Sequence, residues 1–299
     1  MPSRPSAAIA EFSVSDREAG PYGITAGPDG ALWFTMVHHG RIGRITTGGD
    51  VSVHQVEPAT GGPSIITAGP DGALWFTEFR GHRIGRITTA GDITSFPLPT
   101  PDAGPFGIAA GADGALWFTE AGADRIGRIT PGGQVTEFPI PLSGAFPSAI
   151  AAGPDDRLWF TMNQANAIGA VGHDGDVTVH PLPTPAAAPV GITAGADGAL
   201  WFVEIGAGQI GRITPDGKID EFALSDRASR PHAIVADGGG NCWFTEWGAN
   251  RIGRITPDGR IEEHDLPSPA SEPHGIALGP DGAIWTALEI GAVARLTAP

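Results

Sequence analysis

Residues 68–78 read A-G-P-D-G-A-L-W-F-T-E, and versions of this phrase recur along the chain at a constant spacing of 42 residues. Each copy contains one tryptophan, at Trp33, Trp75, Trp117, Trp159, Trp201, Trp243 and Trp285. Each unit then continues into a version of R-I-G-R-I-T-P-D-G, and seven units account for nearly all of the 299 residues. A period of about 40 to 45 residues with several short strand signals is typical of a β-propeller with one blade per repeat.

The unit from residue 105 to residue 146 shows how one blade is expected to form. Residues 107–110 are apolar and suit an inner strand, and residues 115–119 are rich in aromatic and apolar side chains. Residues 125–130 alternate between polar and apolar side chains, as a half-buried strand does, and residues 134–140 form a fourth strand. Asp-Gly and Pro-Gly-Gly turns separate these segments, because Asp bonds its own backbone and Gly accepts a positive φ.

The two ends of the chain predict how the ring closes. Residues 9–12 align with the fourth strand of later repeats, and the chain ends soon after residues 295–297, at the third strand of the seventh repeat. We therefore predict an all-β, seven-bladed β-propeller of four-stranded blades, formed as a single domain by residues 1–299. In this ring the N-terminal strand completes the last blade and leaves no open sheet edge. Deletion of residues 1–16 should then cost much of the stability.

Composition and charge restrict the partners of this chain. The net charge is −15, from 18 basic and 33 acidic residues, so we expect neither a nucleic-acid nor an anionic-membrane partner. The single cysteine, Cys242, permits no internal disulfide and is expected to be a buried structural thiol. No apolar run has the length of a signal peptide or a membrane span, which predicts a cytoplasmic protein. A ring without an exposed edge predicts a monomer.

The repeats act as an internal control for function. A residue present in most repeats is needed to build a blade, whereas a polar residue present in one repeat needs another reason. The tryptophans, the Asp-Gly turns and the arginines of I-G-R-I-T belong to the first class. So do the glutamates that end the second strand in four repeats, for which we expect an arginine partner on the adjacent strand: Glu78, Glu120, Glu204 and Glu246.

A proline precedes the inner strand in every repeat, and the residue after it varies. The seven residues are Tyr22, Ser64, Phe106, Ser148, Val190, His232 and His274. Because these positions are equivalent, their side chains should form a ring around one mouth of the central channel. Tyr22, His232 and His274 come from the first, sixth and seventh repeats, which are consecutive once the ring closes. Three functional side chains are therefore expected in one sector of the rim.

The residue before that proline is charged only in the sixth and seventh repeats, as Arg230 and Glu272. Solvated surface charge is the simpler interpretation of both, but Glu272 and His274 share one side of an extended chain. The seventh repeat also shifts the glutamate after its second strand by one residue, to Glu289. If the first two strands pair as a regular hairpin about Asp281-Gly282, Glu289 lies across from His274.

The predicted cluster of Glu272, His274 and Glu289 defines a type of chemistry. Two neighbouring carboxylates repel each other unless a proton or a cation lies between them. Oxygen ligands favour hard cations such as Mg²⁺, Mn²⁺ or Ca²⁺. A histidine beside such a cation is suited to act as a general base. The residues alone therefore predict a metal-assisted proton transfer at the channel mouth and name no substrate.

Four phrases of the chain resemble those of the virginiamycin B lyase (streptogramin B lyase) family, and the resemblance extends over essentially the whole length. They are G-P-Y-G-I-T (residues 20–25), R-P-H-A-I (230–234), F-T-E-W-G-A-N (244–250) and E-P-H-G-I (272–276). The resemblance implies a monomeric propeller that confers antibiotic resistance by opening the ring ester of cyclic depsipeptides of the streptogramin B type. It implies a carbon–oxygen lyase that works by elimination, consumes no water and requires Mg²⁺, with Mn²⁺ as the other candidate.

The same resemblance implies roles for the five residues that the repeats single out. His274 matches the general base, and Glu272 and Glu289 match the two metal ligands. His232 and Tyr22 match substrate-binding residues. The stretch W-T-A-L-E at residues 285–289 departs from the family, which usually has a second aromatic residue after the tryptophan. We therefore expect the local wall of the pocket to differ here.

Two other functions are compatible with this pattern. A metal-dependent lactonase or esterase would use the same carboxylates with a metal-bound water as nucleophile, and the mass of the product distinguishes it from a lyase. A non-catalytic, ligand-binding propeller would bind a partner at the rim without a metal requirement, since a fold does not determine a function.

Overall fold

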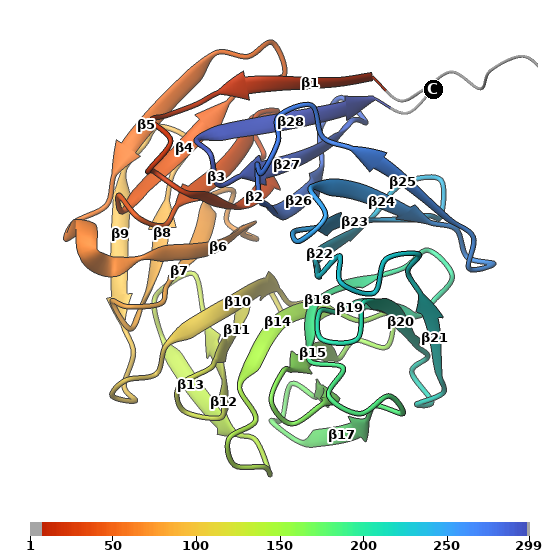
Figure 1. Ribbon diagram of the computed structural model, residues 1–299. Helices are drawn as coiled ribbons and strands as arrows, with labels where there is room; N and C mark the ends of the chain where they lie inside the picture. The colour runs from red at the N-terminus through yellow and green to blue at the C-terminus, as the bar shows by residue number, and fades with distance from the viewer. Residues whose placement is uncertain (1–7, 298–299) are drawn as a thin grey trace, which may run out of the picture.

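Seven four-stranded antiparallel sheets form a closed ring in the computed structural model of the chain, which describes residues 8–297 (Figure 1). The all-β, seven-bladed propeller predicted from the repeats is thereby confirmed. Neighbouring blades pack through their inner strands around a central axis. Within the described residues, no helix is long and apolar enough to cross a membrane.

The strands follow the repeat closely. The innermost strands begin at the repeated proline and are β2 (Pro21–Ala26), β6 (Pro63–Ala68), β10 (Pro105–Ala110), β14 (Pro147–Ala152), β18 (Pro189–Ala194), β22 (Pro231–Ala236) and β26 (Pro273–Leu278). The second strands are β3 (Leu32–Met36), β7 (Leu74–Glu78), β11 (Leu116–Glu120), β15 (Leu158–Met162), β19 (Leu200–Glu204), β23 (Cys242–Glu246) and β27 (Ile284–Leu288). The third strands are β4 (Arg41–Ile45), β8 (Arg83–Ile87), β12 (Arg125–Ile129), β16 (Ala167–Val171), β20 (Gln209–Ile213), β24 (Arg251–Ile255) and β28 (Ala292–Thr297). The outer strands are β5 (Val51–Gln55), β9 (Ile93–Pro97), β13 (Val135–Pro139), β17 (Val177–Pro181), β21 (Ile219–Ala223), β25 (Ile261–Asp265) and β1 (Ala8–Ser13), and a short 3₁₀ turn, η1 (Ala59–Gly61), precedes β6.

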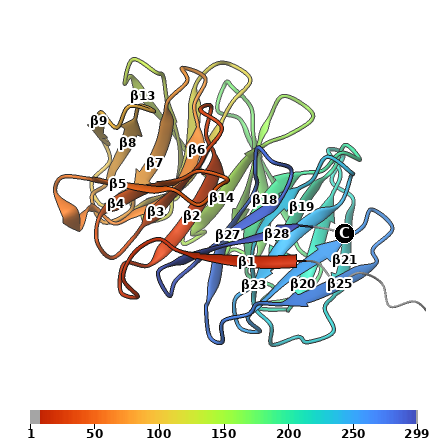
Figure 2. The same cartoon turned by 90° about the horizontal axis from the view of Figure 1, so that it is seen from above.

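The N-terminal strand closes the ring. β1 pairs antiparallel with β28, from Ala8 opposite Thr297 to Ser13 opposite Ala292. The last blade therefore has the order β1-β28-β27-β26, and Figures 1 and 2 show the two ends of the chain side by side in it. The predicted closure is confirmed, and the blade that contains Glu272, His274 and Glu289 is the one that both ends of the chain build.

A buried tryptophan, an aspartate and an arginine hold most blades together. In the first blade, Asp29 accepts hydrogen bonds from Trp33 Nε1 at 3.0 Å and from Arg44 Nε at 2.6 Å. The guanidinium carbon of Arg44 lies 6.0 Å from the centroid of the Trp33 ring. The same trio recurs as Asp71/Trp75/Arg86, Asp113/Trp117/Arg128, Asp197/Trp201/Arg212 and Asp281/Trp285/Arg295. The structural roles that the repeats predict for these residues are therefore confirmed.

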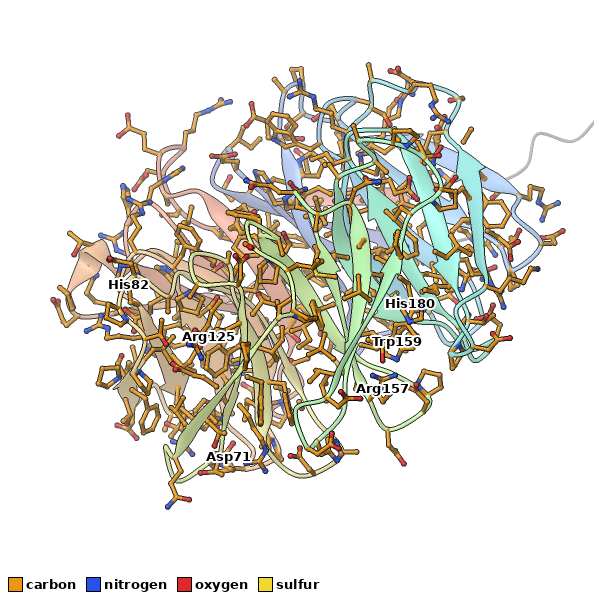
Figure 3. All side chains as sticks on the ribbon, turned by 90° about the horizontal axis from the view of Figure 1, so that it is seen from below. Asp71, His82, Arg125, Arg157, Trp159 and His180 are labelled. Carbon is orange, nitrogen blue, oxygen red and sulfur yellow. The ribbon has the colours of Figure 1, made fainter. Side chains whose placement is uncertain are left out.

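The fourth blade replaces the arginine of this trio. Its third strand carries Ala170 at that position, and Arg157 instead donates to the carbonyl oxygen of Ala170 at 2.8 Å. Trp159 stacks on His180, with ring centroids 5.5 Å apart. Both side chains are labelled in Figure 3. The blade thus keeps its tryptophan packing with different partners.

The expectation of an arginine partner for the second-strand glutamates is correct at one position only. Glu78 forms an ion pair with Arg83 of the adjacent strand. Glu204 accepts a hydrogen bond from Gln209 Nε2 at 2.6 Å instead. The buried carboxylates of Glu120 and Glu246 form no ion pair in the described chain. Cys242 is a buried free thiol, as expected.

Candidate active site

The residue before the repeated proline has a left-handed backbone in every blade. Its φ is 64° at Gly20, 65° at Gly62, 55° at Gly104, 50° at Phe146, 51° at Ala188, 51° at Arg230 and 51° at Glu272. Glycine adopts this conformation freely, whereas other residues pay about 1 to 2 kcal/mol for it. The side chains of Arg230 and Glu272 therefore occupy positions where the backbone alone favours glycine.

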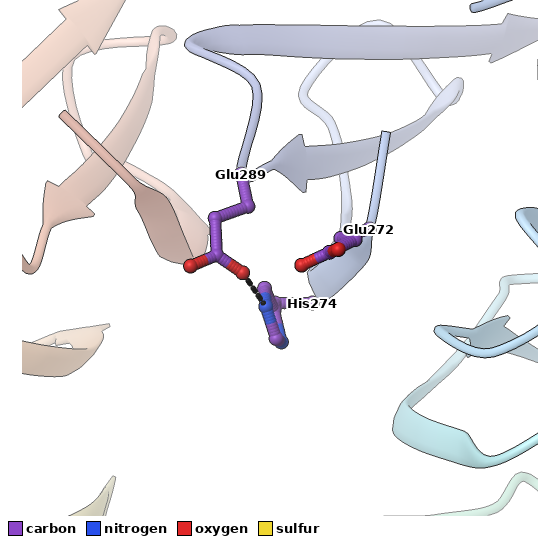
Figure 4. A group of neighbouring side chains, drawn as sticks. All are labelled: Glu272, His274 and Glu289. Atoms are coloured by element: carbon purple, nitrogen blue, oxygen red, sulfur yellow. Dashed lines mark hydrogen bonds and ion pairs between the residues drawn. The ribbon is translucent and has the colours of Figure 1, made fainter. Parts of the chain in front are cut away.

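Glu272, His274 and Glu289 meet at one mouth of the channel (Figure 4). His274 Nε2 lies 2.7 Å from Glu289 Oε2, and one possible ligand atom from each of the three residues lies within 4.8 Å of the others. The backbone N–H of Glu289 donates to the carbonyl oxygen of Glu272 at 3.3 Å. A bond between backbones and a bond between side chains thus fix the relative positions of the cluster.

The register of this hairpin differs from the regular one that the sequence predicts. Pro273 lies opposite Leu288, while Ile276 lies opposite Thr286, so a bulge interrupts β26 between them. Glu289 is consequently next to Glu272 along the ladder and not directly across from His274. Its side chain still reaches the imidazole, because a bulge redirects the side chains around it.

Tyr22 and His232 complete the group. Tyr22 Oη lies 3.2 Å from His232 Nε2. The ring centroid of His274 lies 4.6 Å from that of Tyr22 and 4.9 Å from that of His232. The structure therefore brings together all five residues singled out by the repeats.

Burial and charge set the protonation states of the group. Desolvation, helped by the proximity of His274, lowers the pKa of His232 to about 3, so this imidazole is neutral near pH 7. Desolvation also raises the pKa of Tyr22, which keeps its hydroxyl protonated. The hydrogen bond to His274 is the main cause that lowers the pKa of Glu289 to about 2, so its carboxylate is ionised.

Two residues of the site escaped the sequence analysis. His38, in the loop after β3, places Nε2 3.1 Å from Glu289 Oε1, so imidazoles contact both oxygens of this carboxylate. Trp247, in the loop after β23, has its ring centroid 6.3 Å from that of His274. A comparison of the first loop residue after each second strand could have found the tryptophan, because Trp247 and Glu289 are equivalent by the 42-residue repeat.

Two cavities flank the cluster. One, of about 320 Å³, is lined by Phe79, Phe106 and Phe146 and by the sides of His274 and Glu289. The other, of about 360 Å³, is lined by Arg230, Trp247 and Glu272 among others. The first is largely aromatic, whereas the second has a polar wall.

The donor set of the cluster fits a hard divalent cation. Glu272 and Glu289 supply carboxylate oxygens, and the ionised state of Glu289 favours a cation. Mg²⁺ is commonly held by one or two carboxylates together with oxygens of the substrate. No thiolate lies in the described cluster, in agreement with a preference for oxygen ligands.

A propeller whose channel mouth gathers a hydrogen-bonded histidine and two carboxylates has the composition of an enzyme active site. Residues 7–296 match the virginiamycin B lyase family. The chain belongs to this family and is therefore a lyase-family enzyme.

Solved structures and curated relatives agree with this assignment. The chain is similar to a streptogramin B lyase structure, with 44% identity over 97% of each chain and a TM-score of 0.94. It is also similar to a catalytically inactive histidine variant of the Staphylococcus aureus virginiamycin B lyase with quinupristin, with 43% identity over 98% of this chain and 100% of that one and a TM-score of 0.95. The virginiamycin B lyase of Saccharopolyspora erythraea is 65% identical over 49 residues, which span 16% of this chain and 16% of that relative.

Proposed function

We propose that the protein linearises cyclic depsipeptides of the streptogramin B type by an elimination reaction at the ring ester. The observation that carries this proposal is the arrangement of His274 between the carboxylate of Glu289 and that of Glu272, at a channel mouth flanked by an aromatic cavity. The similarity to an enzyme structure with quinupristin supports the same class of substrate.

His274 is the proposed general base. A ring nitrogen of His274 removes the α-hydrogen of the residue whose β-oxygen forms the ester, and the C–H electron pair becomes a Cα=Cβ double bond. The Cβ–O bond then breaks and the oxygen leaves as part of a carboxylate. Glu289, bonded to the imidazole at 2.7 Å, stabilises the imidazolium that forms. The product is linear and has the same mass as the cyclic substrate.

Glu272 and Glu289 are the proposed ligands of Mg²⁺, with Mn²⁺ as a second candidate. A bound divalent cation supplies a Lewis acid that polarises a neighbouring carbonyl group and stabilises negative charge on its oxygen. The ionised carboxylate of Glu289 and the proximity of Glu272 to it both support this role.

Tyr22 and His232 are the proposed substrate-binding residues. Because His232 is neutral and Tyr22 is protonated, the pair offers hydrogen bonds without a net charge. Their contact at 3.2 Å fixes the orientation of both side chains beside His274. They are thus suited to position amide groups of the depsipeptide against the base.

The decisive experiment incubates the purified protein with a streptogramin B in the presence of Mg²⁺ or of a chelator, followed by mass spectrometry. A linear product of unchanged mass, formed only with metal, supports elimination. A product heavier by one water would instead identify a lactonase or esterase at the same site. Metal-independent binding without any product would indicate a ligand-binding propeller.

A further inference from the structure

The sixth blade repeats the geometry of the active-site blade with different side chains. Arg230 and Trp247 stand one 42-residue repeat before Glu272 and Glu289, respectively. The backbone N–H of Trp247 donates to the carbonyl oxygen of Arg230 at 3.1 Å, as that of Glu289 does to Glu272 at 3.3 Å. The chain thus places an arginine–tryptophan pair in the blade next to the two glutamates.

The guanidinium of Arg230 is held in place without a carboxylate partner. Its central carbon lies 5.2 Å from the centroid of the Trp247 ring, a stacking contact that restricts an otherwise flexible side chain. Within residues 8–297 this arginine forms no ion pair, although the chain has a net charge of −15. Its hydrogen-bond donors are therefore available to a ligand.

The same arginine accepts an unfavourable backbone for its position. Its φ is 51°, where three other blades have glycine. Glu272 is the other charged residue at this position, and it belongs to the candidate site. Phe146 and Ala188 have the same backbone conformation, so the charge of Arg230, and not its φ, distinguishes the sixth blade at this position.

The location of Arg230 connects it with the reacting centre. Arg230, Trp247 and Glu272 line one cavity of about 360 Å³. The ring of Trp247 lies 6.3 Å from that of His274. Arg230 thus lines a space that Glu272 also lines, and Trp247 connects this space with the ring of His274.

We propose that Arg230 binds the carboxylate that leaves when the ester C–O bond breaks. This inference rests on the proposed elimination reaction. The α-proton goes to His274, the C–H electron pair forms the Cα=Cβ bond, and the electron pair of the Cβ–O bond goes to the departing carboxylate. The planar fork of Arg230 matches both oxygens of that group.

The charge of the leaving group determines the kinetic effect. The ester of the substrate is neutral, whereas the carboxylate gains a full negative charge as the C–O bond breaks. An arginine at this position therefore interacts more strongly with the transition state and the product than with the substrate. Its removal should lower kcat and weaken product binding, while KM stays nearly constant.

The test compares Arg230→Gln and Arg230→Lys with Arg260→Gln, which removes the same charge from an exposed turn of the same blade between β24 and β25. For Arg230→Gln we expect kcat to fall at least about tenfold with KM within about twofold of wild type. Calorimetry should show the purified linear product binding at least about tenfold more weakly. Arg230→Lys should retain part of the wild-type kcat and part of the product affinity, because it keeps the charge. Arg260→Gln should match wild type in both. Melting temperatures within a few degrees of wild type confirm that each variant is folded.

The outcomes separate this inference from the proposed function. If the wild-type protein turns over no streptogramin B, the proposed function fails and the inference fails with it. If wild type eliminates normally and Arg230→Gln keeps both kcat and product affinity, only the inference is overturned. A rise in KM at unchanged kcat would overturn it as well, because Arg230 would then contact the neutral substrate.

Discussion

At the scale of the residue, His274 is expected to contribute to the reaction and little to the fold. Its backbone carbonyl accepts a hydrogen bond from Thr245 Oγ1 at 2.8 Å, and this contact survives the loss of the side chain. His274→Ala should lower kcat by about 10²- to 10⁴-fold, the usual contribution of a general base, with a nearly unchanged melting temperature. Steady-state kinetics on the variant measures the effect. His173→Ala, in the exposed turn after β16, is the control, and a His274→Ala enzyme as active as this control would remove His274 as the base.

Glu272 is expected to lower the free energy of unfolding through its backbone conformation and to contribute to activity through its side chain. Its φ of 51° favours glycine, and its side chain is a proposed metal ligand. Glu272→Gly should therefore abolish the response to Mg²⁺, while the free energy of unfolding stays constant or rises by up to about 1 kcal/mol. Chemical denaturation and Mg²⁺ titration of the variant test both parts. Glu272→Gln, which keeps the strain but loses the charge, should lose the Mg²⁺ response without a gain in stability; a marked loss of stability in the glycine variant would contradict the argument.

The internal repeats explain why the sequence revealed these residues. Tyr22, His232 and His274 stand out because equivalent positions in other blades are small or apolar, and this comparison needs no knowledge of distances. His38 escaped because it reaches Glu289 across the junction of the first and last blades. A contact between loops that are 251 residues apart leaves no periodic signal.

At the scale of the element, three blades place two glutamates close together where the sequence predicts a glutamate and an arginine. The second-strand glutamate of these blades faces an outer-strand glutamate, as Glu120 faces Glu137. Burial, followed by the charge of Glu137, raises the pKa of Glu120 to about 8. Glu204 and Glu246 show the same effect, with pKa values of about 8 and about 7. In the second blade, Glu78 instead accepts a hydrogen bond from Ser95 Oγ and forms an ion pair with Arg83.

The raised pKa of Glu120 predicts a dependence of stability on pH. Its folded pKa of about 8 exceeds the ordinary value of 4.5, so the folded protein retains a proton that the unfolded chain releases between these pH values. The free energy of unfolding should therefore fall as pH rises from about 5 to 8, with a contribution of about 1.4 kcal/mol per pH unit from each such group. Urea denaturation at several pH values measures this slope.

Glu120→Gln should make the slope less steep and raise the stability at pH 7, because an amide does not have to take up a proton when the chain folds. Glu78→Gln is the matched comparison at the equivalent position of the second blade. It breaks the ion pair with Arg83, so we expect lower stability. Parallel pH profiles for wild type and Glu120→Gln would disprove the buried-proton explanation.

Strand order and blade number followed from the period, but the register at the active site did not. The bulge between Pro273 and Ile276 recurs in all seven blades, as between Pro105 and Ile108. The residue before each proline has a left-handed backbone, and four non-glycine residues occupy that position: Phe146, Ala188, Arg230 and Glu272. The sequence therefore does not reveal the left-handed conformation at these non-glycine residues. For the same reason it does not reveal that Glu289 lies next to Glu272 and not across from His274.

At the scale of the whole molecule, the closure of the ring and the active site depend on the same blade. β1 supplies the outer strand of the blade that carries Glu272, His274 and Glu289. Phe12 stacks on Trp285 with ring centroids 5.6 Å apart, and Glu11 accepts a hydrogen bond from the backbone N–H of Ser268 at 3.1 Å. The N-terminal strand thus joins the last blade to the loop that precedes it.

Deletion of residues 1–16 should consequently lower stability and activity together. The deletion exposes the edge of β28 and removes the phenyl ring of Phe12, which stacks on Trp285. We expect the melting temperature to fall by about 10 °C or more, since a loss of several kcal/mol shifts a protein of this size by a few degrees per kcal/mol. Calorimetry and turnover of a streptogramin B measure the two effects. A synthetic peptide of residues 1–16 should restore both when added in trans, whereas a scrambled peptide should not. An unchanged melting temperature would show that six blades and three strands of the seventh are stable without closure, and the active-site blade would then be independent of the strand that completes it.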